Sequence, residues 1–134
     1  MAVSTTSDAT GSYNRYSFSF GSNTNDNTKI GVWPDAYYLS ANIFPNGGVF
    51  IGAEACALDR TKILAGNAAT IQCFQRRTSD FSLLPSDLDG ATAPPAGSPN
   101  FFVELGTPTT LNLFSSFPHL GIWARGSRMT AWGM

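Results

Sequence analysis

Charged side chains are scarce in this sequence. They make up 13% of its 134 residues, about half of the usual share in a soluble globular domain. The formal net charge is -1, and no stripe of Lys and Arg alternates with aromatic residues. Nucleic acid is therefore not expected as a partner, because proteins bind it largely through its phosphates.

Long apolar runs and clustered metal ligands are also missing. The run GGVFIGAEACAL is too short and too interrupted to span a bilayer, so we expect no contact with a membrane. The first residues do not have the pattern of a signal peptide. His119 is the only histidine and Cys56 and Cys73 are the only cysteines, which excludes a four-ligand zinc site. We expect no cofactor.

The two cysteines leave two interpretations open. They are either a pair of buried thiols or a disulfide between Cys56 and Cys73. A surface rich in Ser, Thr, Asn and Gly is common in secreted proteins, and an oxidising compartment favours the disulfide.

What the sequence does contain is typical of an all-β protein. Glycine occurs 13 times and proline 8 times, which suits short antiparallel strands joined by tight turns. Tyr16, Phe18 and Phe20 alternate with polar residues, so the period of two predicts a half-buried strand. The Asn46-Gly47 pair predicts a hairpin turn.

Three other segments have their own predictions. Residues 59–65 form one short helix, with Asp59 as its N-cap and Gly66 after its end. Residues 21–28 form an exposed polar loop. Residues 76–99 form a long proline-rich connection, of a kind that is often functional or lies over another surface.

The residue composition changes at Pro118. Residues 118–134 have no acidic side chain and sustain neither the helical nor the strand period. We therefore predict a β domain over residues 1–117 and an irregular tail over residues 118–134. An alternative is that the tail is not native to the fold, for instance through a change of reading frame.

Several stretches carry a resemblance to a known group of proteins. VSTTSDATGSYNRYSFSF, KIGVWPDAYYLSANIF, GAEACALDRTKILAG, ATIQCFQ and LLPSDLDGATAPPAGSPNFF resemble motifs of large secreted bacterial proteins of unassigned function. Those proteins are commonly predicted as β-propellers distantly similar to sialidases. The resemblance implies a secreted or extracellular protein and a partial propeller of about two to three blades, each of about four strands. It also implies that the chain is an internal fragment.

The stretch WPDAYY contains the candidate ligand-binding residues Trp33, Asp35 and Tyr38. An exposed aromatic ring beside a carboxylate acceptor is typical of a sugar-binding platform. Strand alternation sends Tyr37 and Tyr38 to opposite faces, so only one of them can share a surface with Asp35. The alternative is that the tryptophan and one tyrosine belong to the core and Asp35 to a turn.

Catalysis is the rival function. Hydrolysis of a glycosidic bond normally needs two carboxyl groups, or a tyrosine nucleophile in the manner of sialidases. The candidates for these roles are Asp35, Tyr37 and Glu54. No arrangement of the arginines that would hold a sialic acid can be inferred from the sequence.

The stretch LPSDLDG supplies Asp87 and Asp89, two of the oxygen ligands that a calcium loop would use. The residues that follow Gly90 are Ala91, Thr92 and Ala93, which cannot complete the coordination shell. We therefore favour Asp87 and Asp89 as acceptors for backbone N–H groups in a turn, with calcium as the alternative.

Together these observations predict an extracellular binding or structural module without catalysis of its own. Its expected ligand is a glycan or another surface polymer, and its exposed sheet edges could pair with a second copy. The alternative is a fragment of a sialidase-like glycoside hydrolase.

Overall fold

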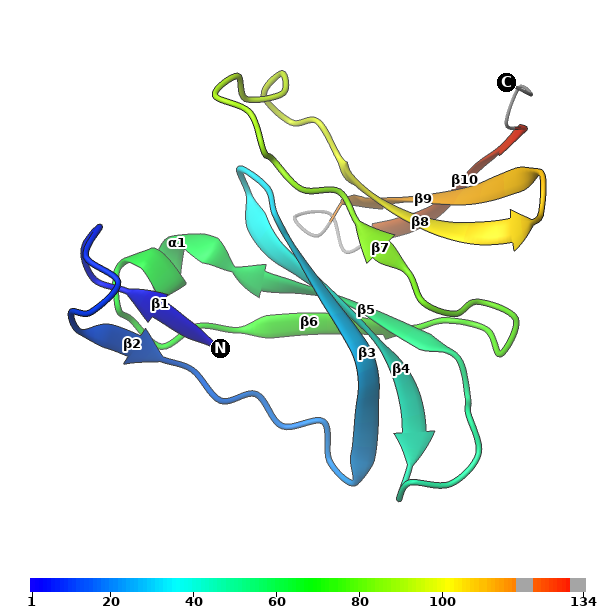
Figure 1. Cartoon of the computed structure of the whole chain (residues 1–134), viewed down its shortest axis with the longest axis horizontal. Coiled ribbons are helices and arrows are strands. Elements are labelled where there is room, and N and C mark those ends of the chain that lie inside the picture. The colour runs from blue at the N-terminus through cyan, green and yellow to red at the C-terminus, as the bar shows by residue number, and fades with distance from the viewer. Residues whose placement is uncertain (118–121, 131–134) are drawn as a thin grey trace.

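The computed structural model describes residues 1–117 and 122–130, and it is an all-β structure with one short helix (Figure 1). Its strands form three antiparallel sheets. The prediction of fold class is confirmed at this level, including the helix near residues 59–65.

The first two sheets use the N-terminal half of the chain. β1 (Ala2–Ser4) and β2 (Tyr13–Arg15) form a two-stranded sheet. The next four strands form a sheet in chain order, which we call the central sheet. Its strands are β3 (Asn23–Val32), β4 (Ala36–Pro45), β5 (Ala53–Asp59) and β6 (Ile71–Gln75), and α1 (Arg60–Leu64) connects the last two.

The third sheet, which we call the C-terminal sheet, also follows chain order. Its strands are β7 (Leu84–Pro85), β8 (Asn100–Thr107), β9 (Thr110–Phe117) and β10 (Ile122–Thr130). The prediction of an irregular tail from Pro118 is wrong for residues 122–130, because they pair with β9. Strand pairing needs only backbone groups that meet a partner, which residue periodicity does not reveal. Residues 118–121 and 131–134 lie outside the described residues.

The core lies on both faces of the central sheet. One face packs against the C-terminal sheet, where Tyr38 of β4 meets Phe102 of β8 edge to face with ring centroids 5.9 Å apart. The other face carries Tyr37 and Leu58, which pack with Ile63 of α1 and with side chains from residues 3–18. The central sheet is therefore the middle of three layers.

Several local predictions are confirmed. The Asp59 carboxylate accepts a hydrogen bond from the Lys62 N–H at 3.0 Å, as an N-cap does. Gly66, after the end of the helix, has φ +71°. Asn46 and Gly47 have φ 51° and 69°, which is the pattern of a type I′ turn.

Other local predictions are wrong, and tertiary pairing explains why. Residues 23–28 are not a loop, because β3 pairs with β4 from Asn23 onward. A shift of register between Asp26 and Lys29 accommodates their turn-forming side chains. The strand expected to run as far as Phe20 ends at Arg15, although Tyr16 and Phe18 still pack against the central sheet.

Candidate functional site

The turn between β3 and β4 presents the predicted aromatic and acidic residues. The Trp33 N–H donates to the carbonyl of Ala36 at 3.1 Å, which closes the turn. Pro34 has no N–H and fixes its own φ, so the chain leaves β3 at this point. Asp35 is exposed and Trp33 is partly buried against the core.

The long connection lies over this turn. The Val32 N–H donates to Asp87 Oδ1 at 2.6 Å, and the Leu88 N–H donates to the Val32 carbonyl at 3.0 Å. Further along, the indole Nε1–H of Trp33 donates to the carbonyl of Ser98 at 3.0 Å. The connection is therefore tied to Val32 near its start and to Trp33 near its end.

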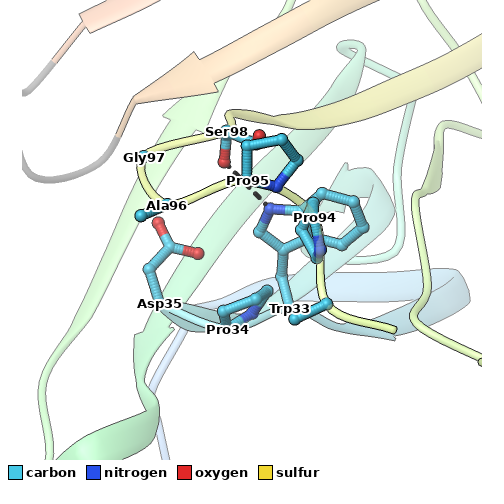
Figure 2. A pocket seen from close by; sticks show the side chains of 9 residues that line it. Trp33, Pro34, Asp35, Pro94, Pro95, Ala96, Gly97 and Ser98 are labelled. Atoms are coloured by element: carbon cyan, nitrogen blue, oxygen red, sulfur yellow. Dashed lines mark hydrogen bonds between the residues drawn. The ribbon is translucent and has the colours of Figure 1, made fainter. Parts of the chain in front are cut away.

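A hollow of about 330 Å³ remains between the turn and the connection. Figure 2 shows the indole of Trp33 beside the rings of Pro94 and Pro95, with the Asp35 carboxylate at the margin. The wall is formed by these side chains together with Pro34, Ala93, Ala96, Gly97 and Ser98. Asp35 is the only charged residue in this wall as far as the described residues form it, so the hollow is a mainly apolar site with one strong hydrogen-bond acceptor.

Tyr38 holds the Asp35 carboxylate in place through a hydrogen bond. Its hydroxyl donates to Asp35 Oδ2 at 3.0 Å, and the tyrosine itself is fully buried. Burial, more than any neighbouring charge, raises the pKa of Tyr38 far above its ordinary value. The hydroxyl therefore keeps its proton and remains a donor to Asp35.

Tyr37 points to the opposite face of the sheet, as strand alternation predicts. It packs with Leu58 and Ile63 there, and the Arg60 guanidinium lies 5.8 Å from the centre of its ring. Trp33, Asp35 and Tyr38 are thus brought together, and Tyr37 is kept apart from them.

Glu54 is also far from Asp35. Ala36, which follows Asp35, pairs with Asp59, whereas Ala41 pairs with Glu54. Five residues of strand, about 17 Å, therefore separate Glu54 from the turn that holds Asp35. Alternation along β5 places Glu54 on the same face as Leu58. Burial raises the pKa of its carboxyl group.

The disulfide between Cys56 and Cys73 is present. The two residues are directly opposite each other on β5 and β6, with the sulfur atoms bonded at 2.10 Å. Glu54 lies within 4.8 Å of both sulfurs. Because a cysteine binds metal as a thiolate, the bonded sulfurs offer no ligand set together with Glu54.

The two aspartates of the long connection have different surroundings. Asp87 accepts the Val32 N–H described above, so its partner is a distant strand rather than the local turn that the sequence suggested. Asp89 is exposed. The sequence also missed the role of the prolines and of the Ser98 carbonyl, which only the path of the connection brings to Trp33.

Comparisons with protein-family models, with curated proteins and with solved structures found no match to this chain. The resemblance to propeller-like secreted proteins therefore stays a prediction. Within the described residues, no helix has the length and apolar character needed to cross a membrane.

Proposed function

We propose that this chain is an extracellular carbohydrate-binding module, with its ligand in the hollow at Trp33. The observation that carries the proposal is the combination of an apolar wall and one supported carboxylate. Small-molecule sites commonly pair aromatic and apolar walls with a few fixed polar groups. In this proposal the C–H face of a sugar ring packs on Trp33 and Pro94, and a sugar hydroxyl donates to Asp35.

The disulfide supports the proposed extracellular location. Disulfides persist in oxidising compartments and are rare in the cytosol. The bond joins adjacent strands of the central sheet, and the scarcity of charged residues is also common in secreted β proteins.

The geometry favours binding over hydrolysis. A hydrolase would need a second carboxyl or a tyrosine placed to act beside Asp35. Glu54 pairs with Ala41, five strand residues from Ala36, and Tyr37 is on the opposite face. Asp59 is nearer, because it pairs with Ala36, but its carboxylate is already engaged by the N–H and the Nζ of Lys62. Tyr38 is fully buried and keeps its proton, so it has no access to a substrate.

A glycan array and a panel of fluorogenic glycosides test this proposal. We expect binding to the array without turnover of the glycosides. Trp33→Ala should lower the affinity at least tenfold, because the ring contact is lost. Asp35→Asn keeps the shape and removes the charge, so it should lower affinity without loss of fold.

Matched controls are available on the same chain. Asp26→Asn removes an exposed carboxylate of β3, and Tyr13→Ala removes an aromatic side chain that is 44% exposed. Neither lines the hollow, so both should bind as the wild type does. Absence of binding to every glycan on the array would refute the proposal. Turnover of a glycoside would favour the alternative function, a glycoside hydrolase.

We also propose that the central and C-terminal sheets are consecutive blades of a β-propeller. Each is a four-stranded antiparallel sheet in chain order, as propeller blades are. The first strands of both sheets, β3 and β7, lie side by side (Figure 1). A Cβ atom on Gly31 of β3 would collide with the Ser86 carbonyl next to β7. An experimental structure should place β3 and β7 next to a common axis; stacking with β3 over β10 would contradict this.

Self-association through an exposed edge completes the proposal. β7 pairs only with Phe102 and Val103 of β8, and within the described residues no strand pairs with the rest of that edge. Leu105 and Leu84 on these strands are 59% and 50% exposed. Light scattering should detect a dimer that Leu105→Lys weakens; a monomer at all concentrations would refute it.

A further inference from the structure

A second hollow lies beside the first. It has a volume of about 320 Å³, and the residues that line it include Asp35, Ala36, Ala57, Asp59, Thr70 and Gln72. Asp35 also lines the first hollow, so a single carboxylate separates the two. The second hollow differs in chemistry, because polar side chains take the place of the tryptophan and the prolines.

Strand register explains why this part of the sheet is hollow and polar. Ala36 pairs with Asp59, and Ala57 pairs with Gln72. The Asp59 N–H donates to the Thr70 carbonyl at 3.0 Å, which places Thr70 beside it. The methyl groups of the two alanines form a low floor, and the longer polar side chains of the same face surround it.

The polar side chains differ in how far they are already engaged. The Asp59 carboxylate caps α1 through Oδ1 and lies 3.4 Å from Lys62 Nζ through Oδ2. Thr70 and Gln72 are exposed, and their side chains make no hydrogen bond to any other residue among those the structure describes. A hydroxyl and an amide are therefore free to serve as donors and acceptors for a ligand.

We infer that the two hollows are consecutive subsites for an uncharged oligosaccharide of at least two sugar units. The inference rests on the proposed function of the first hollow. One unit packs on Trp33 and the prolines, the linkage passes Asp35, and the next unit bonds to Thr70 and Gln72. Each hollow is at the lower end of the usual size of small-molecule sites, roughly 300–1,000 Å³, and both together suit a longer ligand.

The charges of the site select against acidic sugars. Among the residues that the structure describes, the charged ones that line the two hollows are Asp35 and Asp59, and none is cationic. A uronic or sialic acid would bring its carboxylate next to Asp35. Like charges at short range are unfavourable, so acidic oligosaccharides should bind less well than neutral ones of equal length.

The test measures affinity against chain length. Glucose, mannose and N-acetylglucosamine, with their linear β-linked oligomers of two to six units, are titrated by calorimetry and by NMR. We expect at least a tenfold gain in affinity from the monosaccharide to the trisaccharide of the series that binds. The monosaccharide should shift the Trp33 indole N–H signal, and the oligomers should also shift the side-chain amide signal of Gln72.

Variants separate this inference from the proposed function. Thr70→Ala with Gln72→Ala should lower oligomer affinity about 5- to 150-fold, as expected for two hydrogen bonds, and leave monosaccharide affinity unchanged. Thr61→Ala, an exposed threonine of α1, is the control and should change neither. Trp33→Ala should weaken both ligands.

Each outcome has one meaning. Absence of binding by every sugar would overturn the proposed function and this inference with it. Binding at Trp33 that neither rises with chain length nor responds to the Thr70 and Gln72 variants would overturn the inference alone. Preference for a sialylated or uronic oligomer over its neutral counterpart would also overturn it.

Discussion

The ion pair between Arg76 and Asp80 lies in the segment between β6 and β7, next to the C-terminal sheet, and its loss should be the most damaging change of a single charge. Arg76 Nη2 lies 3.1 Å from Asp80 Oδ2, and the side chains are 18% and 4% exposed. The contact is an ion pair outside hydrogen-bond geometry. The guanidinium also lies 4.5 Å from the ring centre of Phe114, a core residue of the C-terminal sheet.

Asp80→Ala leaves the Arg76 guanidinium partly buried without its counter-charge. Removal of one partner from a buried pair typically costs about 3–5 kcal/mol. For a chain of this length, each kcal/mol lowers Tm by roughly 3–5 °C, so Asp80→Ala should lower Tm by about 10–25 °C. The free energy of unfolding is measured by urea denaturation, followed by circular dichroism.

Two further variants serve as controls for Asp80→Ala. Asp89→Ala removes an exposed carboxylate and should change stability by no more than about 0.5 kcal/mol. Arg76→Met with Asp80→Leu removes both charges and should recover most of the loss, because no charge is left buried alone. If Asp80→Ala changes the unfolding free energy as little as Asp89→Ala does, the ion pair does not stabilise the fold as described.

Three other predictions concern stability. Burial raises the pKa of Glu54, so ionisation of this carboxyl opposes folding once the pH exceeds the pKa that Glu54 has in the unfolded chain. Glu54→Gln should therefore be more stable than the wild type at pH 7. The difference should vanish at acid pH, as measured by urea titration. Reduction of the Cys56–Cys73 bond, which closes a separation of 17 residues, should lower stability by about 3 kcal/mol, measured with and without reductant, and no change would contradict this. Gly31→Ala should cost about 1–3 kcal/mol because its new methyl group meets the Ser86 carbonyl. The methyl group of Gly90→Ala would come no closer than 4.0 Å to the Thr92 nitrogen, so this variant should be neutral in the same assay.

The sequence by itself determined the features that depend on near neighbours along the chain. The side chain of Asp59 reaches its own helix, and Asn46-Gly47 has the positive φ angles that this pair favours in a tight hairpin turn. Alternation put Tyr37 and Tyr38 on opposite faces, because side chains of a strand point to either side in turn. Composition and turn residues were enough to establish an all-β chain.

Only the tertiary structure decided which distant segments meet. The residues from Asn23 onward have the composition of a loop, and pairing with β4 makes them a strand. The connection after β7 had no preferred path until bonds from Val32 and Trp33 fixed it over the turn. Both hollows depend on such contacts. Long-range pairing supplies hydrogen bonds that local propensity does not encode. For this reason the candidate residues could be identified from the sequence, whereas the site that they form could not.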